Sequence, residues 1–398
     1  MKIPLVNTTI SEDLKYTILL VPLWWILGIN FLIFHFVTLW MFLKLLISKK
    51  VKRIFFPYPL FFLLIFILIY FSSVLVNLSQ IPFIRSLATL YNLSFWVMGA
   101  LLILTIYNTT KKEEFLAILK ALSTLGLISG MFALASLFLW ISGVQSLQIK
   151  SLVSNMLPTQ SIIAKAPLLR SSLCPYILGT DWIFNKPLPR TPGFNVYPTA
   201  LGATMLFLIP LTLVYYKITK KKRVSLVLFV EFIGLLLSLS RISILGLLGA
   251  WATVNMLLNI KRFSFFLVSQ FILLCIVILL ILIPPYEIVR PIYEFRPPTG
   301  RIKLYKIILS QVVKKPVLGY GYKPRVEEVS IPIGSHSTYM GVVYKTGFFG
   351  FLFFCLVWLS IIIKWWRSRK LKGIAKYLWY YLGIGLIGGL LWMFTEDL

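Results

Sequence analysis

The sequence is short of groups that bind metals or titrate near neutral pH. Its 398 residues include 2 histidines, 3 cysteines and 12 aspartates and glutamates, against 40 lysines and arginines. A magnesium or two-metal site needs several converging oxygen ligands, which so few carboxylates supply poorly. The cysteines are scattered without metal-ligand spacing, so they indicate neither a zinc site nor a disulfide framework. Any chemistry here is therefore expected to rely on histidine and arginine, with no metal and no cofactor.

What the sequence has in excess is apolar residues. They make up 59% of the chain, and the mean hydropathy is +0.89, whereas soluble domains are about 45–50% apolar. Long apolar runs recur from one end to the other, so we predict an all-α, polytopic integral membrane protein. The first run lacks a small-residue cleavage site, and we expect it to be a retained helix rather than a signal peptide.

A transmembrane helix needs about 20 mostly apolar residues. Runs of this kind predict spans at 16–47, 54–76, 88–107, 115–142, 194–217, 224–239, 242–259, 263–284, 337–363 and 377–395. The first run is too long for one straight helix, and Gly28 and Asn30 are the expected breakpoints, which gives about ten or eleven helices.

The spans divide the chain into five parts. These are an N-terminal transmembrane bundle (1–142), a loop (143–193), central transmembrane helices (194–284), a large loop (285–336) and C-terminal transmembrane helices (337–398).

The basic residues predict which side each connection faces. Dense lysine and arginine clusters fall on alternate connections, at 49–53, 111–112, 217–223, 261–262 and 364–376. Short loops rich in Lys and Arg face the cytoplasm, so both long loops and the Ser240-Arg241 turn are expected to face outward. Topology thus explains much of the net charge of +28, and we expect contacts with membrane lipids and no nucleic-acid partner. The outer loops are basic as well, which indicates either contact with anionic headgroups or an anion-binding outer cavity.

The large outer loop contains a predicted amphipathic helix. Tyr305, Ile308, Leu309 and Val312 follow the spacing of one helix face. Such a basic helix either lies on the bilayer surface or caps a cavity. Pro316 is expected to end it, and the following "LGYGY" is expected to form a turn.

Three basic side chains at outer ends of spans are candidate catalytic or binding groups. A neutral imidazole, here His336, can take a proton from an attacking hydroxyl. Guanidinium groups, here Arg190 and Arg241, bind phosphate oxygens and stabilise the charge of a departing phosphate. Attack by a hydroxyl on a sugar carried by a lipid diphosphate suits this set. The alternative reading is a histidine that caps a helix and arginines that reach for lipid headgroups.

These residues belong to a series that resembles the O-antigen ligase and O-antigen polymerase family of bacterial membrane proteins. The order and spacing match over roughly residues 188–352, and Ser337 departs from the asparagine usual at its position. The series is Arg190-Thr191-Pro192-Gly193-Phe194, Ser240-Arg241, Arg301, Pro316-Val317-Leu318-Gly319-Tyr320-Gly321, His336-Ser337-Thr338-Tyr339 and "KTGFFG" at 345–350.

The resemblance implies a GT-C-like, metal-independent glycosyltransferase of the bacterial inner membrane with an extracytoplasmic active site. The implied donor is an undecaprenyl-diphosphate-linked glycan, and the implied acceptor is a lipid or a glycan. On this reading His336 is the base, Arg241 and Arg190 hold the diphosphate, and Arg301 is a further contact. Lys303, Tyr320 and Tyr339 are the remaining candidate substrate-binding residues. Ligases and polymerases share these motifs, and ligation is the preferred reading.

A transporter of lipid-linked glycans is the alternative from another class. Ionisable residues at mid-membrane depth indicate function by default, and Glu231, Lys345 and His35 lie within predicted spans. Against transport, the chain shows neither two-half symmetry nor matched broken helices. A purely structural role for Glu231, paired with Lys345 or another buried cation, is also open.

Overall fold

We describe the protein from a computed structural model. It describes residues 9–47, 54–109, 112–156, 167–183, 186–258, 299–324, 332–334, 336–394 and 396. The predicted span at 263–284, Cys275 and much of the loop 285–336 lie outside the described residues.

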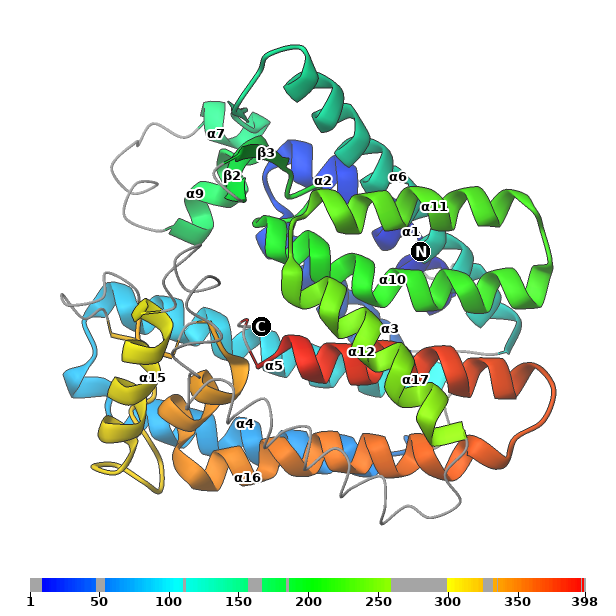
Figure 1. Cartoon of the computed structure of the whole chain (residues 1–398). Helices are drawn as coiled ribbons and strands as arrows, with labels where there is room; N and C mark the ends of the chain where they lie inside the picture. Colours follow the sequence, from blue (N-terminus) through cyan, green and yellow to red (C-terminus); the bar gives the residue numbers. More distant parts are fainter. Residues whose placement is uncertain are drawn as a thin grey trace, which may run out of the picture.

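The described chain is mainly helical, as predicted (Figure 1). Seven of its helices are long and apolar enough to cross a membrane. They are α3 (Asn30–Ile47), α4 (Tyr58–Val76), α5 (Phe83–Thr109), α6 (Lys112–Ile141), α10 (Pro198–Thr219), α16 (Thr338–Arg367) and α17 (Ile374–Trp392). Two somewhat shorter apolar helices, α11 (Arg223–Leu237) and α12 (Arg241–Leu258), correspond to predicted spans as well. The prediction of an all-α polytopic membrane protein is confirmed.

The long N-terminal apolar run is broken, and Gly28 is one of the breakpoints. It forms α1 (Ile10–Leu19), α2 (Val21–Leu27) and α3. Gly28 ends α2 with φ +80°, a left-handed conformation that glycine adopts without steric cost. An ion pair of 2.7 Å between Lys44 Nζ and Asp13 Oδ2 joins α3 to α1. The sequence did not indicate this pair, which satisfies the charge of the buried Lys44.

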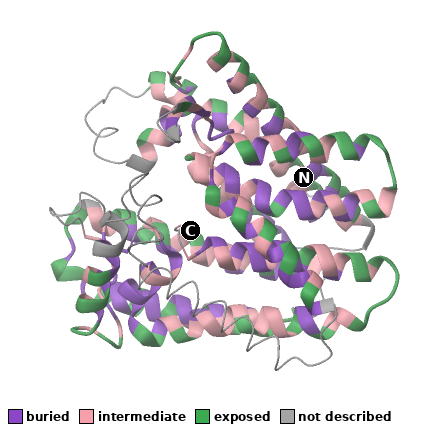
Figure 2. Ribbon diagram, viewed as in Figure 1, coloured by how far each residue is buried: buried purple, intermediate pink, exposed green. Residues whose placement is uncertain are grey.

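The helices pack in two connected groups. α4 lies along α16, while α6, α10 and α11 pack together, and α17 contacts both α10 and α12. Small residues allow close crossings: a Cβ on Gly246 of α12 would lie 3.2 Å from the carbonyl oxygen of Gly388 on α17. Such contacts between small residues are typical of transmembrane helix packing. Figure 2 shows buried residues where helices face one another and exposed residues on their outward surfaces.

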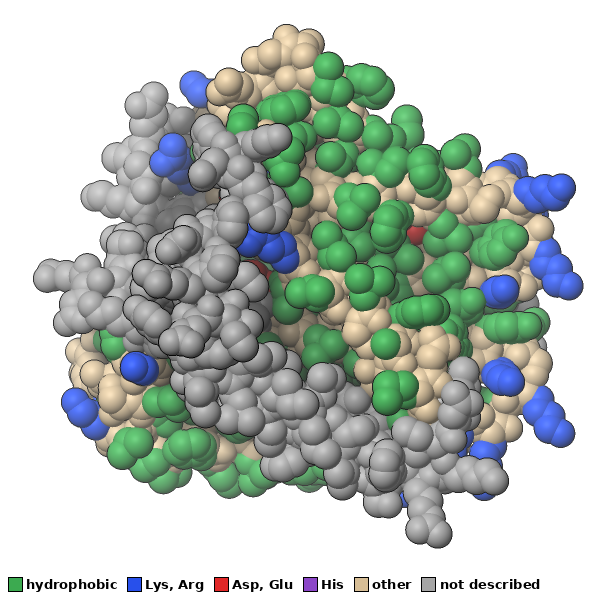
Figure 3. Space-filling view, viewed as in Figure 1, with side chains coloured by type: hydrophobic (Ala, Val, Ile, Leu, Met, Phe, Trp, Pro, Cys, Tyr) green, Lys and Arg blue, Asp and Glu red, His purple; other side chains and the backbone are tan. Residues whose placement is uncertain are grey.

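The outward surfaces of the helices are apolar, and the charges lie at their ends. Exposed large apolar side chains include Phe61, Leu68, Phe138, Phe229 and Leu245. Figure 3 shows hydrophobic side chains over the middle of the helices and many Lys and Arg side chains at the right-hand end. The α10–α11 and α16–α17 connections lie at that end in Figure 1. This distribution suits helices that cross a bilayer.

The first outer loop contains a small sheet that the sequence analysis did not predict. Its strands are β1 (Leu147–Gln148), β2 (Tyr176–Ile183) and β3 (Lys186–Arg190), antiparallel in the order β1-β2-β3. Two short helices, α7 (Leu152–Met156) and α9 (Pro167–Leu173), lie between β1 and β2 in the sequence. β1 has only two residues and β3 contains two prolines, so neither gives a clear strand pattern in the sequence.

The helix predicted in the second outer loop is α15 (Thr299–Val312), which packs on α16. Leu304, Tyr305, Ile308 and Val312 are buried in one cluster with Val343 and Tyr344 of α16. The predicted face is wrong at Leu309, which is 44% exposed. Leu304, four residues before Ile308, is buried instead. The face of α15 that contacts α16 is therefore rotated slightly from the predicted one. α15 thus buries its apolar face against protein.

Candidate functional site

Two of the motifs in the sequence contact each other where α16 is interrupted. At Gly347 the backbone leaves the helix, with φ +66° and ψ −172°, a region open almost only to glycine. The carbonyl groups of Tyr344 and Lys345 accept hydrogen bonds of 2.9 Å from the N–H groups of Tyr320 and Gly321, respectively. The "KTGFFG" motif thus interrupts the helix at Gly347. The carbonyl groups of Tyr344 and Lys345, just before the interruption, are hydrogen-bonded by the Pro316–Gly321 segment instead.

The joined motifs are also tied to α4. Ser73 Oγ donates to the carbonyl oxygen of Lys345 at 2.7 Å, and Asn77 Nδ2 donates to that of Gly319 at 3.2 Å. Lys315 Nζ donates to Asn77 Oδ1 at 2.6 Å. The loop between α15 and α16 is therefore held on the C-terminal end of α4.

Tyr320 is part of this assembly. Its ring stacks on Tyr344 with centroids 4.8 Å apart, and its hydroxyl lies 3.1 Å from the carbonyl oxygen of Gln311, to which it donates. Partial burial and the neighbouring Tyr322 raise the pKa of Tyr320 above its usual value. The contacts of Tyr320 hold α15 against α16, and its predicted role in substrate binding stays a prediction.

His336 lies directly before α16 in a left-handed conformation, with φ +63°. A residue with a Cβ rarely adopts this conformation, at a cost of about 1–2 kcal/mol. The hydroxyl of Tyr305 donates to the carbonyl oxygen of His336 at 2.8 Å. Ser337 then caps α16, because its Oγ accepts from the N–H of Met340 at 3.3 Å. The backbone of His336 is thus held between α15 and the start of α16.

Arg190 and Arg241 meet at the turn between α11 and α12. Arg190 Nε donates to the carbonyl oxygen of Ser238 at 3.2 Å, and its Nη1 lies 3.1 Å from Asp181 Oδ2. The N–H of Thr191 donates to the carbonyl oxygen of Leu237 at 3.2 Å. Arg241 is exposed and begins α12. The structure therefore brings these two predicted site residues to one turn, and Asp181 is a partner that the sequence analysis missed.

The end of α17 lies between this turn and His336. The N–H of Thr338 donates to the carbonyl oxygens of Met393 at 2.9 Å and Glu396 at 2.8 Å. Ile242, next to Arg241, packs on the cluster that contains Met393. Tyr339 donates its hydroxyl to the carbonyl oxygen of Leu390 at 3.1 Å, which gives it a packing role as well. The end of α17 is thus hydrogen-bonded to the start of α16, two residues after His336, and belongs to the cluster on which the residue after Arg241 packs. Arg301 and Lys303 lie in the first turns of α15.

Glu231 and Lys345, a pairing that the sequence left open, lie against different partners. Glu231 is fully buried, and Thr212 Oγ1 donates to its Oε1 at 2.7 Å. Its other oxygen, Oε2, has no hydrogen-bond partner among the described residues. Lys345 lies instead against α4, with Nζ 5.2 Å from the centre of the Tyr70 ring. Glu231 faces α6 and α10, whereas Lys345 faces α4. His35 bonds Ser94 Oγ at 2.7 Å between α3 and α5, which is a packing contact.

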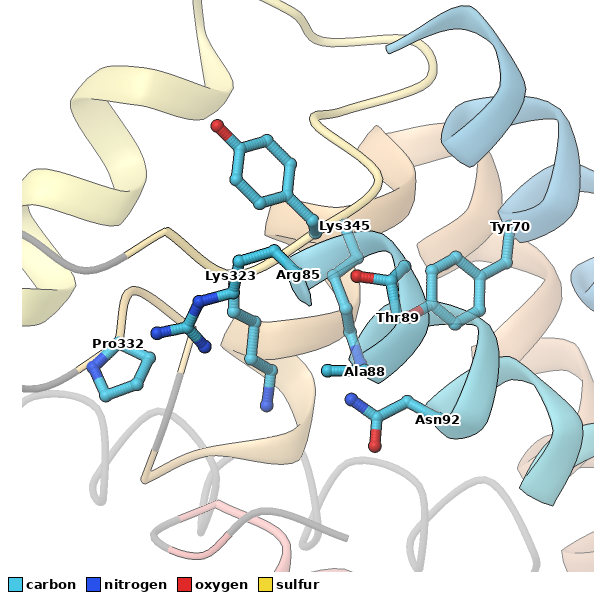
Figure 4. A pocket seen from close by; sticks show the side chains of 9 residues that line it. Tyr70, Arg85, Ala88, Thr89, Asn92, Lys323, Pro332 and Lys345 are labelled. Atoms are coloured by element: carbon cyan, nitrogen blue, oxygen red, sulfur yellow. The ribbon is translucent and has the colours of Figure 1, made fainter. Parts of the chain in front are cut away.

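A cavity of about 100 Å³ lies beside Lys345 (Figure 4). Its lining includes two further cationic residues, Arg85 of α5 and Lys323 of the α15–α16 connection. The sequence analysis had not singled out either residue. Arg85 lies in the first turn of α5, three residues after Pro82. A cationic residue at the start of a predicted span is a signal that the sequence analysis could have used. Among the described residues, no group of three or more His, Cys, Asp or Glu side chains lies close enough together to hold a metal ion.

With these positions established, the chain was compared with known proteins. Residues 224–355 match the O-antigen ligase family model. The match confirms the family resemblance and extends from α11 into α16, so it includes Arg241, Arg301, Lys345 and His336. Arg190 precedes it. No curated protein matches the chain. The O-antigen ligase match supports a function of the ligase or polymerase type in a multi-pass membrane protein.

Proposed function

We propose that the chain is a metal-independent glycosyltransferase that transfers a glycan from undecaprenyl diphosphate to an acceptor hydroxyl at the outer face of the bacterial inner membrane. Two observations support the proposal. Arg190 and Arg241 lie at the same α11–α12 turn, and Arg241 and His336 both fall within the O-antigen ligase match. These side chains supply one base and two anion-binding groups.

The proposed reaction is a single displacement at the anomeric carbon of the donor. The acceptor oxygen forms a bond to this carbon while its proton passes to the imidazole of His336. The bond between the carbon and the diphosphate oxygen breaks, and lipid diphosphate leaves with the electron pair. Arg241 and Arg190 hold the diphosphate and stabilise its growing negative charge. A diphosphate is a good leaving group, so the scheme requires no general acid.

Reconstituted protein tests this scheme. The full chain, a lipid-diphosphate oligosaccharide and a candidate acceptor are combined, and release of free lipid diphosphate is followed. His336→Ala and Arg241→Ala are expected to lower the rate at least a hundredfold, since general bases and charge-stabilising donors each contribute about 10²–10³ or more. Lys314→Ala, an exposed lysine on the same outer loop, is the matched control and is expected to keep wild-type activity.

The remaining outcomes decide between related schemes. Equal release by wild type and both variants would remove His336 and Arg241 from the mechanism, and loss of activity with EDTA would refute metal independence. The length of the product separates the alternatives within the family: one transfer per acceptor indicates a ligase, and a ladder of repeat units indicates a polymerase.

A second candidate function is transport of a lipid-linked glycan, which the buried Glu231 favours. Its Oε2 atom has no hydrogen-bond partner in the described part of the chain, and such a carboxyl group is costly inside a membrane. A transporter that uses Glu231 would be inactivated by Glu231→Gln and would survive His336→Ala. The transferase is expected to show the opposite pattern.

A further inference from the structure

The cavity beside Lys345 is lined by groups that donate hydrogen bonds. It lies between α4, α5, the start of α16 and the segment that follows Gly321. Figure 4 shows the ends of Lys323 and Lys345 and the amide of Asn92 directed toward a common space. Its polar lining residues are Tyr70, Arg85, Thr89, Asn92, Tyr322, Lys323 and Lys345, and neither Asp nor Glu is among the described residues that line it.

Lys345 is a buried cation without an anionic partner among the described residues. Its side chain is 7% exposed, and its one described polar contact is the ring of Tyr70, 5.2 Å away. A cation–π contact offsets only part of the cost of removing an ammonium group from water. The hydroxyl of Tyr70 is also buried, and it has no hydrogen-bond partner within the described ranges. Two polar groups at this cavity thus lack the partner that buried polar groups normally have.

A second lysine, Lys323, lines the same cavity. Burial, and secondarily the charge of Lys345, lower the pKa of Lys323 well below its usual range. Arg85 adds a guanidinium group, which stays protonated under all ordinary conditions. Cations that face one another in a partly dehydrated space repel, and an anion between them relieves both the repulsion and the loss of solvation.

The size and the donors of the cavity define the ligand. Ammonium, guanidinium, hydroxyl and amide groups together recognise the oxygens of phosphate, sulfate or carboxylate. The cavity volume of about 100 Å³ is several times what one water molecule needs. The cavity therefore has room for an oxyanion group.

We propose that this cavity binds a single oxyanion group, held between Lys345, Lys323 and Arg85. It is a second anion site, separate from the arginines at the α11–α12 turn, and it does not depend on the proposed transferase reaction. The oxyanion comes either from a free inorganic ion or from an anionic group on a lipid or lipid-linked glycan.

The site is connected to the segment that positions His336. The N–H of Ile333 donates to the carbonyl oxygen of Pro324 at 2.8 Å. A Cβ placed on Gly334 would lie 3.7 Å from Cε of Lys323. An oxyanion that fixes Lys323 would therefore brace the residues just before His336.

Thermal unfolding of the purified full chain in an uncharged detergent tests the proposal. Sulfate and phosphate are titrated at constant ionic strength, with chloride as the reference. We expect both oxyanions to raise the Tm of the wild type in a saturable manner and beyond the effect of chloride. Lys345→Met and Lys323→Met are each expected to weaken this binding at least tenfold, whereas Lys314→Met, the exposed lysine on the same loop, keeps it.

Three controls separate oxyanion binding from a general change in stability and identify the source of the oxyanion. In chloride alone, Lys345→Met is expected to unfold at the wild-type temperature or above, because it removes a buried cation that faces other cations. Lys323→Met lies outside the membrane spans and provides a second variant should Lys345→Met fail to fold. A lipid arm compares phosphatidic acid with phosphatidylcholine in mixed micelles: stabilisation by phosphatidic acid alone identifies a lipid phosphate as the source.

Three results would overturn the proposal. One is a wild type that gains no more from phosphate, sulfate or phosphatidic acid than from chloride. Another is oxyanion binding that both lysine variants retain at the strength of Lys314→Met. The third is an effect that Arg241→Ala abolishes and Lys345→Met leaves intact, which would assign the anion to the α11–α12 turn. Loss of transferase activity by itself would not bear on this site, since the assay contains no donor or acceptor.

Discussion

At the scale of single residues, Arg190, which we propose to bind the diphosphate, is already held in place by the protein. The sequence marks it as a phosphate contact, and the structure adds two contacts that fix its guanidinium, to Asp181 and to the carbonyl group of Ser238. A guanidinium has five N–H donors in a rigid fork, so it can make these contacts and others at once. Fixing the side chain beforehand reduces the entropy that ligand binding would otherwise cost.

A double-mutant cycle tests the ion pair between Arg190 and Asp181. Both side chains are partly shielded, at 22% and 11% exposure, so the coupling free energy is expected to be about 1–2 kcal/mol. Asp181→Ala, Arg190→Ala and the double variant are compared by the free energy of unfolding in a detergent titration. Strict additivity of the two single changes would show that the pair contributes nothing to stability.

The ion pair between Asp181 and Arg190 could have been predicted only if strands β2 and β3 had been predicted first. Asp181 of β2 lies opposite Leu188 of β3, so Arg190 is two residues further along the same face. Diagonal neighbours of this kind are within reach of long side chains. Without the strands, nothing indicates that a carboxylate nine positions away is adjacent. Arg190 itself was found because its position before a span and its motif were visible in the sequence.

At the scale of elements, the interruption of α16 organises the outer end of the protein. Two motifs about 25 residues apart in the sequence (316–321 and 345–350) become one unit through backbone hydrogen bonds. The sequence predicted α16 and named both motifs, yet it did not predict their contact. Side-chain periodicity reveals which face of a helix is buried, and it carries no information about where a carbonyl group loses its helical partner.

Gly347→Ala tests the importance of this interruption. The new Cβ would be strained by the positive φ and would meet the carbonyl group of Val317, so we expect a loss of stability of about 3 kcal/mol or more. Gly99→Ala in α5 is the matched control, because a Cβ there has no neighbour within 4 Å among the atoms considered. It is expected to be neutral or stabilising by about 0.5–1 kcal/mol. Thermal unfolding in detergent compares the two, and equal Tm values would contradict the assigned role of Gly347.

At the scale of the whole molecule, the sequence predicted the helices better than the groups they bring together. Apolar length fixes the spans because an unsatisfied backbone cannot cross a bilayer, and the described helices match the predicted runs within a few residues. The sequence left the pairing of Glu231 with Lys345 open, because hydropathy gives the depth of a residue and not the helix that it faces. The cavity beside Lys345 is lined by α4, α5, the α15–α16 connection and α16, so no single stretch of sequence indicates it.

The orientation of the molecule is the property on which the proposed reaction depends most. The structure places the α10–α11 connection at one end of the helices and the α15–α16 connection at the other (Figure 1). The basic cluster at 217–223 predicts that the first of these faces the cytoplasm. His336 and the α11–α12 turn, with Arg190 and Arg241, would then face outward, where lipid-linked glycans replace nucleotide sugars as donors.

Cysteine labelling decides this orientation. Lys221→Cys and Lys314→Cys, both at exposed positions, are made in a chain whose 3 cysteines are replaced by serine. A membrane-impermeant maleimide is added to right-side-out vesicles and to inverted vesicles. We expect label at position 314 only in right-side-out vesicles and at position 221 only in inverted ones. The reverse pattern would put the arginines and His336 in the cytoplasm. It would remove the outer-leaflet donor from the proposed function, while leaving the helix packing and the oxyanion cavity as they are.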